Sequence, residues 1–380
     1  MDRSRICWTV LIVAYATSIA AVYFLLTPLK ELFRVSDFEN YWLLTQQFLA
    51  KENPYDFEKL VAASVHGNVG PAHFGPWVYI LFLPILSWSF ETSLFIYFVV
   101  NITAWCGLGV VAANLFAPRK LALSEAALSS LLFTPAFLTF FYGQWSIIVA
   151  IFGYLALFAW KRGLYPLCGA MLACATIKPH LGFLVWAALV VLAVIQRRWS
   201  VLGAGAITLG VLTGTSELLF PGITSNWLNA FSSSLGWKTA SLIMPIRLAF
   251  ATPADPYPAI PAIVIPLIIL WGVCTFFSKK DEFSLLPASP YLFALSCLFA
   301  PYIWPFDYTV MIGLHFAIFH SATAEDEQRT SLNRVLLLIF SCVFFLHFFS
   351  ENQTLALSTY WYPIALLYLY ARTRSDSVAR

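Results

Sequence analysis

The sequence contains very little charge. Asp, Glu, Lys and Arg make up 11% of the 380 residues, whereas about 25% is typical of soluble domains. Hydrophobic residues make up 60%, and the mean hydropathy is +0.77. This balance excludes an ordinary soluble domain and indicates an all-α, polytopic membrane protein. The net charge of +3, without a basic tail or patch, gives no indication of nucleic-acid binding.

Cysteine patterns typical of metal sites are missing too. No CxxC pair occurs, and no His stands at ligand spacing from a cysteine. The cysteines lie in or beside apolar runs, as small buried hydrophobic residues do. The seven positions are Cys7, Cys106, Cys168, Cys174, Cys274, Cys297 and Cys342. We therefore expect no cofactor, and a divalent metal is left as an open alternative that the cysteine pattern does not support.

Long apolar runs, by contrast, occupy most of the chain. A spanning helix needs about 20 apolar residues, and fewer where it is buried among other helices. Candidate spans are residues 8–27, 93–116, 121–142, 144–160, 164–178, 180–196, 200–219, 258–277, 285–303, 306–320, 334–350 and 355–371. The first run follows a basic start and is long enough to span, so we interpret it as an uncleaved anchor. We expect about twelve transmembrane helices in one domain, residues 1–380.

The stretch 74–89 is the doubtful span, because it is short and contains Pro76 and Pro84. If it is re-entrant or interfacial, fifteen of the 22 Lys and Arg residues fall on the side of the termini. Short cytoplasmic loops carry excess Lys and Arg, so both termini are expected in the cytoplasm of a cell inner (plasma) membrane. Residues 28–74 and 220–257 then form two long outer loops, and the first is expected to carry short helices and the active site.

This topology brings scattered polar residues to one membrane surface. They are Asp37, Asn53, His66, His73, Gln144, Lys178, His180 and Asp307. Lys178 ends an apolar run and precedes Pro179 and His180. A lysine there either reaches for lipid headgroups or, backed by His180, holds a lipid-linked phosphate.

Asp37 follows the first apolar run, and Tyr41 is placed four residues on, at the spacing of one helix face. Trp42 suits the membrane interface. The carboxylate is either merely solvated or, partly desolvated beside aromatic walls, suited to act as a general base. Glu39 is expected to point to solvent.

Three further sites have structural interpretations as well as functional ones. The run Asn53-Pro54-Tyr55-Asp56 is typical of a turn. Gln144 stands at a helix start, where capping, packing and ligand binding are all open. Asp307 either caps the next helix or contributes to the site.

The ordered set of these motifs resembles glycosyltransferase family 87, the polyprenyl-phosphate-mannose-dependent mannosyltransferases of the GT-C class. The residues that carry the resemblance cover most of the chain: Asp37-Phe38-x-x-Tyr41-Trp42, Asn53-Pro54-Tyr55, the stretch 75–84, Gly143-Gln144, Lys178-Pro179, Pro301 and Trp304. One departure stands out. Members of the family often carry a His after the late Pro and Trp, and this chain has Phe306 and Asp307 there, which leaves the acceptor and the mode of phosphate binding open.

The resemblance implies a GT-C-like membrane enzyme with an outer-loop Asp, here Asp37, as general base. The expected reaction moves a hexose, with mannose the expected sugar, from a polyprenyl-phosphate sugar to a glycan or glycolipid by inverting single displacement. Lys178, His180 and the weaker candidate Arg247 would bind the donor phosphate. Residues expected to contact donor or acceptor are Tyr41, Trp42, Asn53, Tyr55, Gln144, Trp304 and Asp307. A divalent metal is not required, and Asp37 and Asp307 alone make a poor hard-cation site. The rival interpretation is a polytopic transporter or flippase, weakened by the lack of ionisable residues in the middle of any predicted span.

Overall fold

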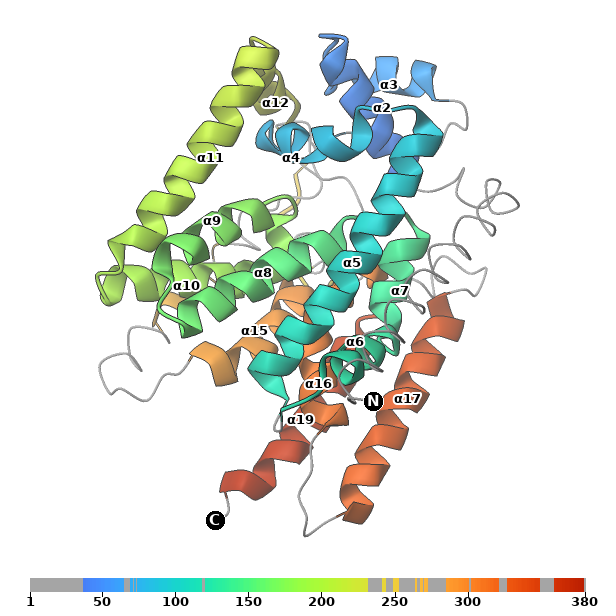
Figure 1. The fold of residues 1–380 in the computed structure, drawn as a ribbon, viewed down its shortest axis with the longest axis vertical. Coiled ribbons are helices and arrows are strands. Elements are labelled where there is room, and N and C mark those ends of the chain that lie inside the picture. Colours follow the sequence, from blue (N-terminus) through green and yellow to red (C-terminus); the bar gives the residue numbers. More distant parts are fainter. Residues whose placement is uncertain are drawn as a thin grey trace, which may run out of the picture.

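A computed structural model of the chain describes residues 37–64, 69–70, 72, 74–117, 120–231, 241–243, 249–252, 264, 267–268, 270–272, 285–300, 302–320, 327–348 and 359–378. Within this part the protein is built from helices and has no strand, which confirms the all-α prediction (Figure 1). The helices are α2 (Asp37–Leu49), α3 (Phe57–Ala63), α4 (Trp77–Leu86), α5 (Phe90–Phe116), α6 (Leu123–Leu131), α7 (Thr134–Phe141), α8 (Ser146–Lys161), α9 (Tyr165–Ala175), η1 (Pro179–Gly182), α10 (Phe183–Ile195), α11 (Trp199–Leu219), α12 (Ile223–Phe231), α15 (Leu285–Phe299), η2 (Pro305–Met311), α16 (Ile312–Phe319), α17 (Glu327–Phe348) and α19 (Trp361–Val378). The expected spans 8–27 and most of 258–277 lie outside the described residues.

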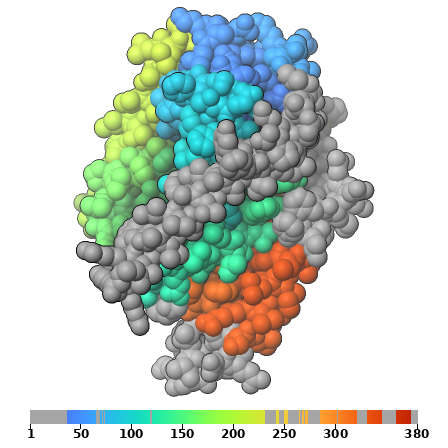
Figure 2. Space-filling model, turned by 45° about the vertical axis from the view of Figure 1, so that its right-hand side comes forward, coloured from blue at the N-terminus to red at the C-terminus, as the bar shows by residue number. Residues whose placement is uncertain are grey.

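Helix α3 of the first predicted outer loop starts where the sequence supplies a cap. In α3, the Asp56 side chain accepts a hydrogen bond from the Lys59 backbone N–H at 3.2 Å. Just before it, Asn53 Oδ1 accepts from the Tyr55 backbone N–H at 3.1 Å, which closes the predicted turn. Side-chain oxygens satisfy backbone donors that the first helical turn leaves without partners. Figure 2 shows α2, α3 and α4 gathered at one end of the molecule, with α17 toward the other.

Helix α4 lies within the stretch 74–89, and hydrogen bonds fix both of its termini to neighbouring helices at the end of the molecule that carries α2. At its start, the Ser216 hydroxyl donates to the Pro76 carbonyl at 2.7 Å. At its close, Gln46 Nε2 donates to the Leu86 carbonyl at 2.7 Å. With ten residues and Pro84 inside it, α4 lies across the end of the bundle rather than through it.

The central helices pack into one large hydrophobic core. Helix α9 packs between α8 and α11, and α5 packs against α6, α8 and α16. Gly169 allows α9 and α11 to come close, because a Cβ there would lie 2.0 Å from the Val201 carbonyl oxygen. Trp145, Tyr97 and Tyr154 are among the largest fully buried side chains. The core therefore reaches from the end that carries α2 into the body of the bundle.

The expected span 121–142 is not one straight helix. It divides into α6 and α7, which are bent by 69° at the intervening residues. Thr134 and Pro135 begin α7. Because proline has no backbone N–H to donate to the preceding turn, α6 cannot continue through Pro135, and a new helix starts there. Two helices of the described part, Phe90–Phe116 and Trp199–Leu219, are long and apolar enough to cross a membrane, or up to three if the bent pair counts as one span. The number of about twelve spans stays a prediction.

The outer face of α11 is apolar and exposed. Ile207, Val211 and Leu218 are 68%, 61% and 84% exposed. A water-facing helix would carry polar residues on such a face. This surface is the kind that a hydrocarbon environment tolerates, in agreement with the membrane assignment.

Basic residues gather at helix junctions far from α2. Lys161 Nζ donates to the Asn114 carbonyl at 3.3 Å, between α8 and α5. Arg162 and Arg198 lie over the rings of Phe158 and Tyr165, at 5.2 and 4.6 Å from the ring centroids. Helix α8 runs from Ser146 to Lys161, so its basic end points away from its polar start. Three of the positive charges used to predict the cytoplasmic side, Lys161, Arg162 and Arg198, thus lie at the end of α8 and at the start of α11.

This arrangement predicts opposite accessibility for two exposed positions. In a Cys342→Ser background, which removes an exposed thiol, Glu58→Cys should react with a membrane-impermeant thiol reagent in intact spheroplasts. Arg162→Cys should react only after the membrane is opened. Labelling of both positions in sealed spheroplasts would contradict the predicted topology.

Candidate active site

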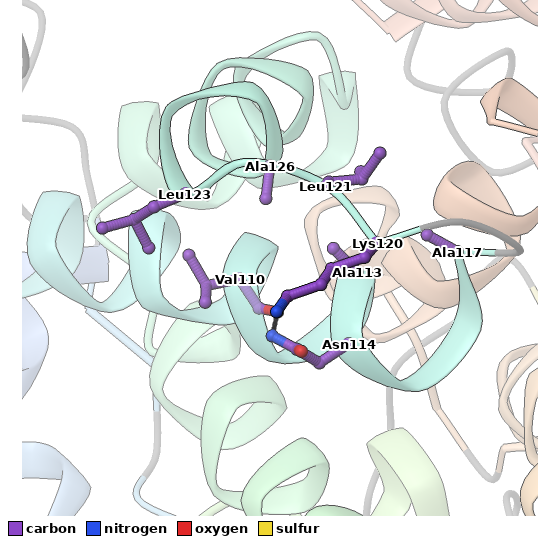
Figure 3. Close-up of a pocket in the computed structure, with 8 residues that line it drawn as sticks. All are labelled: Val110, Ala113, Asn114, Ala117, Lys120, Leu121, Leu123 and Ala126. Carbon is purple, nitrogen blue, oxygen red and sulfur yellow. Dashed lines mark hydrogen bonds between the residues drawn. The ribbon is translucent and has the colours of Figure 1, made fainter. Parts of the chain in front are cut away.

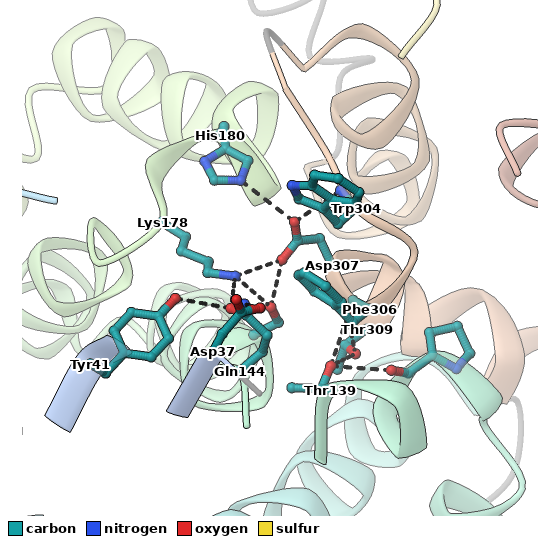
Figure 4. A network of polar contacts seen from close by, with 12 residues as sticks. Asp37, Tyr41, Thr139, Gln144, Lys178, His180, Trp304, Phe306, Asp307 and Thr309 are labelled. Atoms are coloured by element: carbon teal, nitrogen blue, oxygen red, sulfur yellow. Dashed lines mark hydrogen bonds and ion pairs between the residues drawn. The ribbon is translucent and has the colours of Figure 1, made fainter. Parts of the chain in front are cut away.

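Four segments that are far apart in sequence meet in one polar network. Asp37 begins α2, Gln144 lies in the turn between α7 and α8, Lys178 follows α9, and Asp307 lies in η2 (Figure 4). All four residues belong to the set that the sequence predicted to converge. The structure therefore brings an acid, an amide and a cation together in one place.

The turn before α8 places Gln144 against the start of α2. Gly143 has a φ of +68°, which favours glycine. An added Cβ would also lie 2.5 Å from Phe38 Cβ. The Asp37 backbone N–H donates to the Tyr142 carbonyl at 3.1 Å, which joins the two segments directly. A side chain at position 143 would thus push α2 and its carboxylate away from Gln144.

Lys178 lies on extended backbone just before Pro179. A residue that precedes proline disfavours the α conformation, so the helix cannot continue through Lys178, and α9 has already ended at Ala175. Its ammonium donates to Gln144 Oε1 at 2.6 Å, Asp307 Oδ1 at 2.9 Å and Ser146 Oγ at 3.2 Å. These contacts use all three N–H donors of the ammonium.

The ion pair between Lys178 and Asp307 is nearly buried. Their side chains are 13% and 1% exposed, respectively. Asp307 Oδ1 also accepts from the Ser146 hydroxyl at 2.6 Å, and Oδ2 accepts from the Trp304 backbone N–H at 3.1 Å. Asp307 therefore caps the start of η2, as one interpretation predicted, and also balances the lysine charge. Its contribution to an active site stays a prediction.

His180 lies behind the ion pair. Its Nε2 is 3.8 Å from Asp307 Oδ2, and its ring lies 3.9 Å from that of Tyr302 between centroids. The His180 residue is 4% exposed. It contacts the carboxylate side of the pair, and among the described residues no hydrogen bond or ion pair joins it to Lys178 or Asp37.

Gln144 links the ion pair to Asp37. Its Oε1 accepts from the Tyr41 hydroxyl at 2.9 Å as well as from Lys178. Two donors on one oxygen fix the orientation of the amide, and Nε2 is left to donate to Asp37 Oδ2. The predicted placement of Asp37 and Tyr41 on one helix face is confirmed, since both side chains contact Gln144.

Burial raises the pKa of Asp37 above its usual value. Desolvation is the largest cause, and the nearby Asp307 adds to it. The hydrogen bond from Gln144 and the charge of Lys178 act in the opposite direction and favour the carboxylate. Asp37 is thus a stronger base than a solvated aspartate.

Other predicted residues support the surroundings of the network. Trp42 Nε1 donates to the Trp88 carbonyl at 3.0 Å, and the Tyr55 hydroxyl donates to the Phe74 carbonyl at 3.1 Å. Tyr55 belongs to a second hydrophobic cluster with Tyr79 and Phe220. None of the hydrogen bonds in the described part connects Trp42, Asn53 or Tyr55 to Asp37 or Lys178. Arg247, Pro301, His66 and His73 lie outside the described residues.

The expectation for Glu39 was wrong. It is 7% exposed, because α2 packs against α4 and α5 and buries most of its turns. Ser146 was missed altogether, although it is fully buried between Lys178 and Asp307. Its position two residues after Gln144, at the start of α8, was the available signal.

The described residues contain no group of three or more His, Cys, Asp or Glu side chains that could hold a metal ion. A cavity of about 220 Å³ lies elsewhere, between the end of α5 and the start of α6 (Figure 3). Asn114, Lys120 and Ala126 are among its lining residues, and none of its lining residues belongs to the network.

The buried ion pair predicts an unequal effect of single and double substitutions. Asp307→Asn leaves the Lys178 ammonium without its anion, so unfolding in detergent should be easier by about 3–5 kcal/mol. Asp307→Leu combined with Lys178→Met should recover most of that loss. Asp56→Asn, which keeps a good helix cap, serves as the control and should change little. Equal destabilisation by Asp307→Asn and Asp56→Asn would show that the pair is not a structural element.

Comparison with known proteins identifies the class. The sequence pattern of glycosyltransferase family 87 matches residues 73–301, more than half of the chain. The match includes Gln144 and Lys178, begins after Asp37 and ends before Asp307. A comparison with curated proteins finds no match.

Among solved structures, the crystal structure of ArnT from Cupriavidus metallidurans bound to undecaprenyl phosphate is similar, with a TM-score of 0.44 and 12% identity. The alignment covers 96% of this chain and 77% of ArnT. The family match favours the transferase interpretation over a transporter, as the ordered motifs predicted. The all-α membrane protein described here belongs to glycosyltransferase family 87.

Proposed function

We propose that this membrane glycosyltransferase moves a hexose, with mannose the expected sugar, from a polyprenyl-phosphate donor to a hydroxyl of a glycan or glycolipid. The donor class follows from the resemblance of the ordered motifs to family 87. The observation that carries the proposal is the Asp37 carboxylate, held by Gln144 next to the Lys178 ammonium. A base and a cation stand side by side, as a direct displacement on a sugar phosphate requires.

The reaction is a single displacement at the anomeric carbon. Asp37 takes the proton of the acceptor hydroxyl, whose oxygen forms a bond to the anomeric carbon. The bond from that carbon to the phosphate oxygen breaks, and the lipid phosphate leaves with the electron pair. Attack from the side opposite the leaving group inverts the anomeric centre. The written step needs no metal ion and no cofactor.

Negative charge moves through the site during this step. At the start it resides on Asp37, and at the end Asp37 is neutral and the lipid phosphate carries one more negative charge. Lys178 lies close enough to Asp37 to favour its carboxylate form. An ammonium close to both groups would stabilise the negative charge on Asp37 before transfer and on the lipid phosphate after it. The site would then need little rearrangement of its charged groups during the reaction.

The phosphate would have to replace one existing partner of Lys178. The contact with Ser146 Oγ is the longest of the three, at 3.2 Å, and its acceptor is uncharged. A phosphate oxygen carries charge and makes a stronger hydrogen bond to an ammonium. Exchange of the Ser146 contact would leave the pair with Asp307 intact. Arg247 stays a weaker candidate for the same phosphate, and His180 would act through Asp307.

The active site is proposed on the outer side of the inner (plasma) membrane, with both termini in the cytoplasm. The separation of the network from the basic helix junctions supports this orientation. A lipid-linked donor would then reach the site from the bilayer, and the acceptor would meet it on the same side.

Asp37→Asn tests the base. The substitution keeps the shape of the side chain but removes the basic oxygen, so transfer should fall by roughly 10²–10⁴-fold. Because the pKa of Asp37 is raised, the wild-type rate should also decline on acidification at a higher pH than an ordinary aspartate would give. The measurement is kcat/KM against pH with a purified, reconstituted enzyme and a polyprenyl-phosphate sugar.

Asp56→Asn is the matched control for that experiment. It changes an aspartate of the same outer segment that caps α3, and it should retain near wild-type transfer. If Asp37→Asn transfers sugar at a rate close to that of Asp56→Asn, Asp37 is not the base.

Lys178→Ala tests the phosphate contact. A charge-assisted hydrogen bond contributes about 1.5–3 kcal/mol, so the KM for the donor should rise about ten- to a hundredfold. Lys178→Arg should recover part of the loss. The control is Lys161→Ala, at the other end of α8, which should keep the wild-type KM for the donor. An unchanged donor KM in folded Lys178→Ala protein would assign this lysine a structural role alone.

A further inference from the structure

Gln144 makes contacts that do not suit a substrate ligand. It is 5% exposed. Its oxygen accepts from Tyr41 and Lys178, at 2.9 and 2.6 Å, and its nitrogen donates to Asp37. The amide oxygen and one amide N–H thus already have hydrogen-bond partners within the protein. These partners hold the amide in a single orientation (Figure 4).

The geometry points to Gln144 as a positioning residue for the general base. This inference rests on the proposed function of Asp37 and adds a role for the amide beside it. The Gln144 side chain donates a hydrogen bond to Oδ2 of the Asp37 carboxylate, which leaves Oδ1 to accept the proton of the acceptor hydroxyl. The Lys178 and Tyr41 hydrogen bonds to Oε1 polarise the amide and strengthen its N–H donation.

The restraint has a physical reason in the surroundings of Asp37. An aspartate has two side-chain torsions, and rotation of the carboxyl group would exchange the two oxygens. Gly143 brings the amide within reach by allowing Phe38 to pack against the turn. Asp37 is therefore held at two points: its backbone N–H donates to the Tyr142 carbonyl, and its carboxylate accepts from Gln144.

Several groups with charge or titratable protons face Asp37, and each contributes to its protonation. Lys178 approaches from the segment after α9 and Asp307 from η2. The described tyrosines that face it come from α2, α5 and the turn before α8: Tyr41, Tyr97 and Tyr142. In the described part of the chain, the side-chain hydrogen bond to the carboxylate comes from none of these groups but from the neutral amide of Gln144. Removal of its N–H should therefore be visible in the titration of Asp37.

Gln144→Met tests the inference, because it keeps the length of the side chain and removes the donor. A hydrogen bond to the charged form lowers the pKa of a carboxyl group, so its loss should raise the pKa of Asp37. The acidic limb of kcat/KM should move up by about one pH unit, and kcat should fall. The control is Gln47→Met. Gln47 is also a buried glutamine, but it lies on α2, ten residues after Asp37, and makes no hydrogen bond to it in the described part. It should leave the limb in place.

An infrared titration gives a readout that does not depend on transfer. The carboxyl band that is missing in Asp37→Asn identifies Asp37, and its midpoint should rise in Gln144→Met but not in Gln47→Met. If Gln144→Met does not fold, Gln144→Asn, which withdraws the N–H by one methylene, serves in its place with the same expected shift.

Two results would overturn the inference. One is an unchanged Asp37 midpoint in the folded variant, and the other is a raised donor or acceptor KM without any shift of the acidic limb, which would make Gln144 a substrate ligand. Failure of the proposed function would look different, because the wild-type enzyme would then transfer no sugar while the infrared midpoint still reported on Gln144.

Discussion

The buried pair of Lys178 and Asp307 is the interaction on which the site depends. Taking an ammonium and a carboxylate out of water costs several kcal/mol per ion, and only close pairing with further hydrogen bonds offsets that cost. Here Ser146, Gln144 and the Trp304 backbone supply those bonds. Because these groups come from three separate segments, and Gln144 also contacts Asp37 of a fourth, the pair, the turn before α8 and the start of α2 are correctly placed only together.

Much of this arrangement could be predicted from the sequence. The lengths of the apolar runs predicted the all-α membrane fold. The positions of Lys and Arg predicted which end of each helix lies on the cytoplasmic side. The predicted topology assigned Asp37, Gln144, Lys178 and Asp307 to one membrane surface, and the structure brings them into direct contact there. The ordered motifs also indicated family 87, which the match over residues 73–301 confirms. The roles of the individual residues remain proposals.

The rest depended on three-dimensional packing. Glu39 was expected in solvent because acids usually lie there, but α4 and α5 cover its helix. Ser146 is a common residue at a helix start, and only the approach of η2 makes its hydroxyl a bridge between Lys178 and Asp307. The positioning role of Gln144 could not be read from spacing either, since it depends on which way the amide faces. Periodicity gives the face of a helix but not the orientation of a polar group in a turn.

The central claim is that an acceptor hydroxyl, deprotonated by Asp37, attacks the donor sugar directly. The most direct test is the anomeric configuration of the product, measured by nuclear magnetic resonance on the glycan made by the reconstituted enzyme from a donor of defined configuration. The account predicts inversion at the transferred sugar. Retention of the donor configuration would mean a double displacement or attack from the side of the leaving group, and either would contradict it.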